Sequence, residues 1–185
     1  WNFVEFAILQ IDATHVPLYP TLAENDLKII LNDAEVKVLF VATKELYEKV
    51  QRIQHEVPSL TAIYTYDDVE GALSWESVKE LGKKNDRATL KEWNDKVSPE
   101  DLLTLIYTSG TTGNPKGVML THSNLVSNVV SCNKICPAGT HKALSFLPLS
   151  HIFERMIVYM YLSVGVSVYY AESMDTIADN LREVK

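Results

Sequence analysis

The chain has 185 residues, of which 46% are hydrophobic and 22% are charged, with 7 Gly and 7 Pro. This composition excludes a disordered or collagen-like chain and allows one or two domains with a substantial core. The 17 basic residues against 24 acidic ones leave a formal net charge of −7. That balance argues against a nucleic-acid partner, which needs a basic face, but it allows a small anion bound by one locally positive loop.

The cysteine content and the ends of the chain bear on where the protein works. Two cysteines are too few for a disulfide scaffold, so we expect a reducing compartment, the cytoplasm. No secretory or transit segment opens the chain. The most apolar stretch, residues 156–171, is interrupted by Ser and Gly and is shorter than the roughly 20 apolar residues of a membrane span, so we expect it in the core. Because the chain starts at Trp1 and stops at Lys185 within a helix-like stretch, we expect a piece of a larger protein.

In the first half of the chain, apolar segments of strand length alternate with segments of helical period, which predicts an α/β fold of layered β-sheet and helices. Thr21 and Glu24 have the spacing of a capping box. The apolar run 36–42 is typical of a strand buried on both faces, and the charged residues 71–97 predict a solvated surface helix or insertion. Helices are expected over residues 1–10, 27–34 and 46–53, and strands over residues 16–19, 36–42 and 60–64.

The second half of the chain predicts a hairpin followed by helices and strands. Residues 98–101 begin with Ser and Pro and predict a short helical turn, and Thr121 is placed to cap a helix. Strands are expected over residues 102–107 and 117–120, as a hairpin, and over residues 143–147 and 166–170, with a helix from about residue 150 between them. One apolar stripe of the helix after Thr121 predicts buried core thiols and contains Leu125, Val129, Cys132 and Cys136.

The densest chemistry lies in residues 107–116, where hydroxyl residues, two glycines and Lys116 follow a predicted buried strand. Glycines let the backbone approach a ligand, successive backbone N–H groups form an anion-binding nest, and the hydroxyls and Lys116 add donors and positive charge. Together these groups suit a polyphosphate, although by composition alone such a stretch is most often a flexible loop. The candidate phosphate-binding residues are Thr108, Ser109, Gly110, Thr111, Thr112, Gly113 and Lys116.

This loop does not fit the Walker A pattern, Gly-x-x-x-x-Gly-Lys-Ser/Thr. Counting from Gly110, Pro115 stands at the second glycine position, and Lys116 is followed by Gly117 rather than by Ser or Thr. The magnesium-binding hydroxyl of that pattern is therefore missing, which argues against a P-loop kinase or GTPase.

Three segments, in matching order and spacing, resemble the adenylate-forming superfamily of acyl-CoA synthetases, peptide-synthetase adenylation domains and luciferases. Residues 105–116 resemble its signature loop, and residues 13–21, with Val-Pro-Leu-Tyr-Pro-Thr, resemble its upstream segment. Residues 146–155, Phe-Leu-Pro-Leu-Ser-His-Ile-Phe-Glu-Arg, are similar to a segment of long-chain fatty acyl-CoA synthetases.

The resemblance implies that residues 1–185 are part of the AMP-binding N-terminal domain of an acyl-adenylate-forming enzyme. Within it, the charged surface insertion would span about 71–97 and the phosphate-loop subregion about 102–185. Three features of the family have no match here: a later Tyr-Gly-x-Thr-Glu segment, the aspartate that holds the ribose, and a C-terminal domain with a catalytic lysine. We therefore expect the chain to be inactive alone and to work with the remainder of its own chain.

The resemblance also implies the reaction of a long-chain fatty acid–CoA ligase: ATP, fatty acid and coenzyme A give acyl-CoA, AMP and pyrophosphate through an acyl-adenylate, with Mg²⁺. Lys116 would offset the charge on the leaving pyrophosphate, and His151 would position the acyl carboxylate, so these two are the catalytic candidates. Some fatty-acyl members carry a gating Trp four residues beyond this His, where Arg155 stands here. A lipid substrate is compatible with peripheral membrane contact, although the sequence encodes no anchor.

Other interpretations of the same residues stay open. The chain is also compatible with an adenylation domain for an aryl or amino acid, or with a nucleotide-binding module that performs no chemistry. His151 and Glu154, three residues apart, fit one helical face as metal ligands, but such a pair without a third ligand is more often structural. No metal site is therefore predicted.

Overall fold

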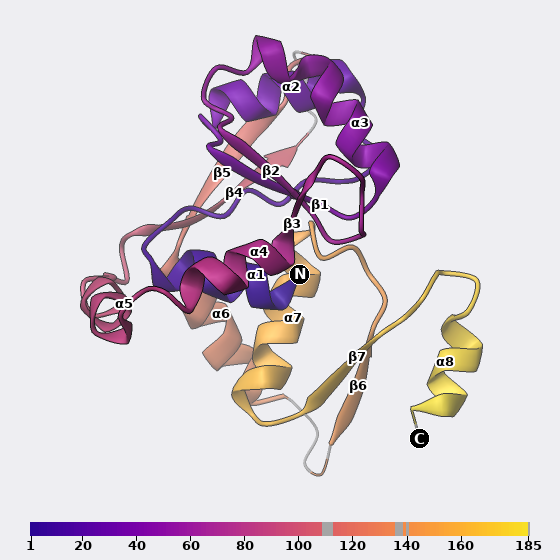
Figure 1. Ribbon diagram of the computed structural model, residues 1–185. Helices are drawn as coiled ribbons and strands as arrows, with labels where there is room; N and C mark the ends of the chain where they lie inside the picture. Colours follow the sequence, from indigo (N-terminus) through magenta and orange to yellow (C-terminus); the bar gives the residue numbers. More distant parts are fainter. Residues whose placement is uncertain (109–112, 136–138, 140, 185) are drawn as a thin grey trace.

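The computed structural model describes residues 1–108, 113–135, 139 and 141–184 (Figure 1). Helices and strands alternate along the chain, as the sequence predicts. The helices are α1 (Asn2–Gln10), α2 (Glu24–Asp33), α3 (Lys44–Ile53), the 3₁₀ turn η1 (Gln54–Glu56), α4 (Trp75–Gly82), α5 (Arg87–Asn94), α6 (His122–Asn133), α7 (Ile152–Ser163) and α8 (Ile177–Glu183). The strands are β1 (Val38–Val41), β2 (Ala62–Thr65), β3 (Leu73–Ser74), β4 (Leu102–Thr108), β5 (Lys116–Thr121), β6 (Lys142–Ser145) and β7 (Ser167–Tyr170).

The upper part of the molecule in Figure 1 is a parallel sheet, β1-β2-β3, covered by α2 and α3. Helix α3 starts where the Thr43 hydroxyl accepts a hydrogen bond from the Leu46 N–H at 3.4 Å, a normal N-cap. The core between this sheet and its helices consists of Leu27, Leu31, Leu39, Val41, Val50, Ile53, Val57, Leu60 and Ile63.

The prediction that the strand over 36–42 is buried on both faces is wrong. In β1 the burial alternates, because Leu39 and Val41 face the core while Val38 is 45% exposed. The opposite face is covered only in part, by a stack of Phe40 on Tyr64 with ring centres 5.3 Å apart. An apolar run is therefore compatible with a one-sided strand when aromatic side chains shield each other on the second face.

Two further predictions, both near the start of the chain, are wrong. Residues 16–19 form no strand, and only His15 makes an isolated parallel bridge, to Thr104. Pro17 lacks the N–H that the next rung of a parallel ladder requires, so the pairing stops there. The capping box also fails, since Thr21 lies in a turn closed by the Leu22 N–H and the Tyr19 carbonyl, and α2 begins after Ala23 without a side-chain cap.

Residues 71–97 hold the two short helices α4 and α5, neither of which buries a residue. Charged side chains pair along these segments, as in the i,i+3 pair of Lys79 with Glu76 within α4. The predicted helical turn at 98–101 is a hydrogen-bonded turn without a helix, closed by the Asp101 N–H on the Ser98 carbonyl at 3.0 Å.

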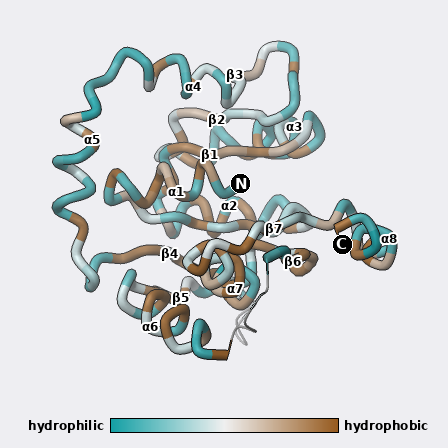
Figure 2. The backbone as a smooth tube through the Cα atoms, turned by 90° about the horizontal axis from the view of Figure 1, so that it is seen from below, coloured by the Kyte–Doolittle hydropathy of each residue, from teal (hydrophilic) through white to brown (hydrophobic). Residues whose placement is uncertain are grey.

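The lower part of the molecule packs α1, α6 and α7 around β4 (Figure 2), where hydrophobic stretches of the chain gather. Its buried core consists of Leu103, Leu125, Val129 and Met160. The predicted hairpin is confirmed as the antiparallel pair β4–β5, and Thr121 caps α6 in a capping box with Asn124. Cys132 packs against this core, whereas Cys136 lies outside the described residues.

The apolar stretch 156–171 belongs to the core only in part: Val158, Met160 and Val166 are buried, whereas Leu162 and Val164 are exposed. It comprises most of α7, the following turn and β7, which pairs in parallel with β6. Over the part of the chain that the structure describes, none of the helices has both the length and the apolar character that crossing a membrane requires.

Candidate functional site

Two of the predicted phosphate-binding side chains belong to residues that lie opposite each other at the loop end of the β4–β5 hairpin. Thr108, the last residue of β4, is the cross-strand partner of Lys116, the first residue of β5, and both are exposed. Gly113 between them has a φ of 91°, a conformation that favours glycine. The remaining predicted residues of the loop, Ser109, Gly110, Thr111 and Thr112, lie outside the described residues.

The next pair along the hairpin, on the side away from the loop, is Tyr107 with Gly117. The Tyr107 hydroxyl donates a hydrogen bond to the Asp33 carboxylate, the last residue of α2, at 2.5 Å. Burial and then the Asp33 carboxylate raise the pKa of Tyr107, so the phenol keeps its proton and remains a donor. A Cβ on Gly117 would lie 3.1 Å from Cζ of the Tyr107 ring, so only glycine fits under this ring without a shift.

His151 lies on a different element, at the N-cap of α7. Its Nδ1 accepts a hydrogen bond from the Phe153 N–H at 3.2 Å, so the proton of the neutral ring is on Nε2. The side chain is exposed, and Nε2 can donate to an anion. Within residues 1–108, 113–135 and 141–184, no hydrogen bond or ion pair joins His151 to the hairpin.

A pocket of about 160 Å³ lies between β6 and α7, the helix whose N-cap is His151. Its polar groups satisfy each other, because the Ser145 hydroxyl donates to the buried Glu154 carboxylate at 2.5 Å. Glu154 and His151 thus have different partners, and the structure does not bring them together as a pair of metal ligands. The pocket is otherwise lined by apolar and aromatic side chains: Leu144, Phe146, Leu147, Phe153, Ile157, Val158 and Tyr161.

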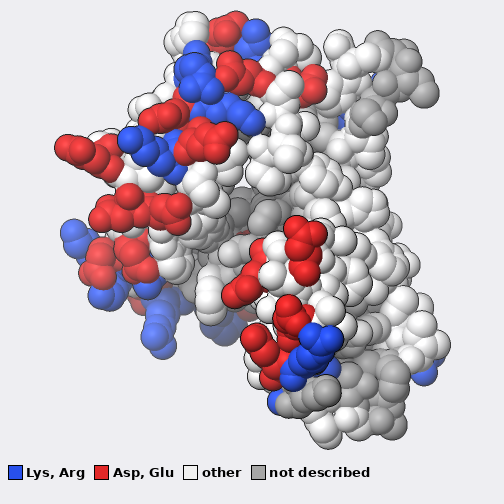
Figure 3. Space-filling view, turned by 90° about the vertical axis from the view of Figure 1, so that its right-hand side faces the viewer, with Lys and Arg blue, Asp and Glu red and all other residues white. Residues whose placement is uncertain are grey.

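A second pocket, of about 260 Å³, lies between the end of α1 and α5 and contains none of the predicted residues. It is lined by Ile11, Asp12, Trp93 and Lys96. On the face of the molecule shown in Figure 3, Lys and Arg side chains lie beside Asp and Glu side chains.

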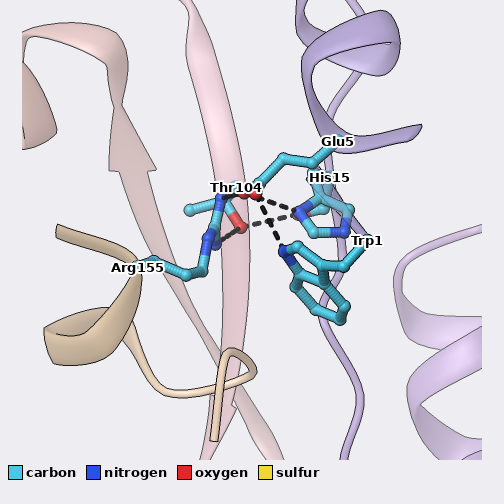
Figure 4. A network of polar contacts seen from close by, with 5 residues as sticks. All are labelled: Trp1, Glu5, His15, Thr104 and Arg155. Atoms are coloured by element: carbon cyan, nitrogen blue, oxygen red, sulfur yellow. Dashed lines mark hydrogen bonds and ion pairs between the residues drawn. The ribbon is translucent and has the colours of Figure 1, made fainter. Parts of the chain in front are cut away.

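A buried polar network, drawn in Figure 4, joins α1, β4 and α7 below the hairpin. Arg155 forms an ion pair with Glu5 at 2.5 Å through one terminal nitrogen and donates to the Thr104 hydroxyl at 2.9 Å through the other. Thr104 donates in turn to the His15 carbonyl at 2.6 Å, and Trp1 donates to the second oxygen of Glu5 at 2.9 Å. Arg155, Thr104 and Glu5 are at most 2% exposed.

The charges in this network are set by burial and by the partners together. Burial would raise the pKa of Glu5, but the contact with His15 and the charge of Arg155 outweigh it and lower that pKa from 4.5 to about 2. Burial lowers the pKa of His15, whose Nδ1 lies 3.4 Å from Glu5, so this imidazole is neutral at pH 7. The network therefore holds one anion and one cation away from water.

The sequence analysis missed Glu5 and Thr104 and treated Arg155 only as a replacement for a gating Trp. The available signal was a charged residue in each of two apolar helical segments: Glu5 is the single charged residue of α1, and Arg155 stands beside Glu154 in the otherwise uncharged α7. Charged residues are almost never fully buried unless they are paired, so such residues in predicted core helices indicate a mutual ion pair.

A family model of AMP-binding enzymes matches residues 1–185. Fatty acyl-CoA synthetase A of Dictyostelium discoideum is 38% identical over 178 residues, covering 89% of this chain and 26% of that protein. Human long-chain-fatty-acid–CoA ligase 6 is 35% identical over 178 residues, covering 85% of this chain and 24% of that protein. The chain thus spans about a quarter of the length of these relatives.

A solved structure with the same fold is the inhibitor-bound N-terminal domain of FACL13 from Mycobacterium tuberculosis. It has a TM-score of 0.77 and 22% sequence identity, over 98% of this chain and 43% of that chain. The fold class predicted from the sequence is therefore confirmed. Since the family model spans all its residues, the chain belongs to the AMP-binding enzyme family.

Proposed function

We propose that this chain forms part of the ATP-phosphate and acyl-carboxylate site of a long-chain fatty acid–CoA ligase. In the first step, a carboxylate oxygen attacks the α-phosphorus of ATP, an acyl–phosphate bond forms, and the bond to the β-phosphate breaks to release pyrophosphate. In the second step, the thiol of coenzyme A attacks the acyl carbon, loses its proton and displaces AMP. The names of the two curated relatives support this substrate class.

The observation that carries the proposal is the pairing of Thr108 with Lys116 across the mouth of the hairpin. This register puts a hydroxyl and an ammonium group on either side of a glycine-containing loop, so that both can reach one polyphosphate. Such donors stabilise the charge that develops on pyrophosphate as it leaves, since they are already oriented before the reaction. Residues 109–112 and Gly113 would supply further backbone and hydroxyl donors.

His151 and the neighbouring pocket support an acid with an apolar tail as the second substrate. A donor on Nε2 suits a carboxylate, which is ionised at neutral pH and needs orientation rather than a general base. The pocket beside it offers apolar surface, because Glu154 and Ser145 bond to each other. Mg²⁺ enters the proposal as the counter-ion of the triphosphate, and coenzyme A as the thiol substrate.

The test is ATP–pyrophosphate exchange by the full-length protein that carries this sequence, with a long-chain fatty acid, an aryl acid and amino acids supplied separately. Exchange that depends on the long-chain fatty acid supports the proposal. If exchange depends on another acid instead, the adenylation chemistry is supported and that acid replaces the long-chain fatty acid as the proposed substrate. Protein that binds Mg-ATP but exchanges with no acid is a nucleotide-binding module and contradicts the proposal.

The role of Lys116 has its own test. We expect Lys116→Ala to lower the rate of exchange about 100-fold, as loss of one oriented donor does elsewhere, while the dissociation constant of the acid stays unchanged. Lys83→Ala is the matched control, because Lys83 is an exposed lysine paired with Glu80 on α4. Equal losses of rate and of acid binding in the Lys116 variant would contradict the assignment.

A further inference from the structure

We infer that Arg155 is a positioning residue for the adenylation step, acting through its buried fork to Glu5 and Thr104. The inference rests on the proposed function, because it concerns how the phosphate loop after β4 and His151 at the start of α7 are held at a fixed distance from each other. Arg155 itself lies beneath the site and needs no contact with a substrate.

The geometry of the fork is specific. One terminal nitrogen of Arg155 meets Glu5 at 2.5 Å and the other donates to the Thr104 hydroxyl at 2.9 Å (Figure 4). The contact with Thr104 has the geometry of a hydrogen bond, whereas the contact with Glu5 is a close charge pair without hydrogen-bond geometry, so the planar guanidinium fixes the direction of the first and the distance of the second. The fork therefore sets the distance and the orientation of α7 relative to both α1 and β4.

The two residues of the Arg155–Thr104 hydrogen bond lie on the two elements that carry the proposed site. Thr104 is in β4, the strand that ends at Thr108 beside the phosphate loop. Arg155 is one helical turn after His151, and its N–H donates to the His151 carbonyl at 3.3 Å. A hydrogen bond between Arg155 and Thr104 thus connects the strand that carries the phosphate-binding residues with the helix end that carries the proposed carboxylate-binding residue.

A third segment of the chain, which contains His15, completes this set of contacts. We call the contacts among Glu5, Arg155, Thr104 and the His15 carbonyl the brace. The Thr104 hydroxyl donates to the His15 carbonyl, and the same carbonyl accepts from the Leu105 N–H at 3.1 Å. Thr104 is therefore engaged on both sides, as acceptor from Arg155 and as donor to His15. Neither it nor Arg155 can change position without breaking buried polar contacts, which is costly.

The burial and the ion pair of Arg155 argue against a gating role at this position. A gate must swing between two states, whereas the Arg155 side chain is 1% exposed and pairs with a buried carboxylate. Arg155 is held in place at the position where some fatty-acyl members of the family carry a gating Trp. The consequence for the reaction is pre-organisation, because two bound substrates react only when the attacking oxygen and the phosphorus are aligned.

The experiment compares Thr104→Val, Arg155→Lys and the double variant in the full-length protein. Both substitutions remove the Arg155–Thr104 contact and leave a positive charge opposite Glu5. We expect each to lower kcat of ATP–pyrophosphate exchange about tenfold or more, with KM values for ATP and acid changed less than about twofold. The double variant should lose about as much kcat as Arg155→Lys alone, because the contact that Thr104→Val removes is already lost in that variant.

A second measurement on the same variants is amide hydrogen exchange, which does not depend on activity. Peptides covering residues 102–108 and 151–163 should both exchange faster in each variant, because the brace holds the two segments together. Val50→Ala in the core of α3 is the control for general destabilisation, since Val50 is buried and far from the network in the fold. It should lower the unfolding temperature without lowering kcat.

The outcomes separate this inference from the proposed function. If the wild type exchanges normally and both variants keep their kcat, the brace is only structural and the inference is overturned. The inference is also overturned if Val50→Ala lowers kcat as much as the two variants do, because general destabilisation would then explain the loss. If the wild type is inert with every acid, the proposed function fails, and hydrogen exchange decides alone: acceleration in both peptides supports the brace, and acceleration in one or neither overturns it.

Discussion

Glu5→Gln tests whether the buried network stores electrostatic free energy. The substitution keeps the shape of the side chain and removes the charge opposite Arg155. A pKa lowered from 4.5 to about 2 corresponds to about 3 kcal/mol of folding free energy at neutral pH. This agrees with the roughly 3–5 kcal/mol that loss of one partner costs when it leaves a buried charge unpaired. Glu5 is 2% exposed, so little of this is screened by water.

The pH dependence has a defined sign. The folded-state pKa of Glu5 is lowered, so its contribution is complete above the unfolded value of 4.5 and is lost as the pH falls toward 2. About 2 kcal/mol of it should be gone at pH 3. The Gln side chain does not titrate. The difference in unfolding free energy between wild type and variant should therefore be about 3 kcal/mol at pH 7 and shrink in acid.

The assay is urea unfolding of the full-length protein and its variant at pH 7, 4 and 3. Subtracting variant from wild type at each pH cancels the other carboxylates. Glu56→Gln is the matched control, because it makes the same chemical change in the exposed pair with Lys28 at 2.9 Å and should alter stability little. A difference for Glu5→Gln that stays constant from pH 7 to pH 3 would refute the reasoning, since packing alone would then account for it.

Two further predictions concern the hairpin and the start of α7. Gly117→Ala should lower the rate of adenylation about tenfold, because its Cβ would lie 3.1 Å from the Tyr107 ring and displace the start of β5. An unchanged rate together with a higher unfolding temperature, as alanine normally gives in a strand, would show that the ring can accommodate the Cβ. His151→Asn should keep α7 capped while removing the Nε2 donor, so the KM for the acid should rise about tenfold with the unfolding temperature unchanged. His151→Ala is the companion variant for the second prediction, since it removes cap and donor together, and an equal effect of both variants on stability would contradict the capping role.

Local signals in the sequence predicted the parts of the fold that depend on neighbouring residues. Thr121 caps α6 because hydroxyl and amide side chains satisfy the first N–H groups of a helix wherever the helix lies. The hairpin was predictable because two apolar strands flank a glycine-containing loop. The error at residues 16–19 was avoidable, since Pro17 cannot donate to a ladder whichever strand lies beside it.

The network below the site could not be assigned from local patterns. Glu5 and Thr104 come from segments without a shared motif, and the contact of Arg155 with both depends on the docking of α1 and α7 against β4. Whether an apolar strand such as β1 is covered on one face or both also depends on its neighbours. The proposed chemistry of the site rests on composition and on the order of the motifs, whereas the contacts of Arg155 required coordinates.

The pairing of Glu5 with Arg155 has a consequence for the order of folding during synthesis. The β1-β2-β3 sheet with α2 and α3 uses contacts within one short region and can form as soon as that region leaves the ribosome. Helix α1 is made before this sheet, yet the partner of its buried carboxylate is translated about 150 residues later, after roughly 8–30 s at about 5–20 residues per second. Helix α1 therefore reaches its native place later than the sheet that follows it in the chain.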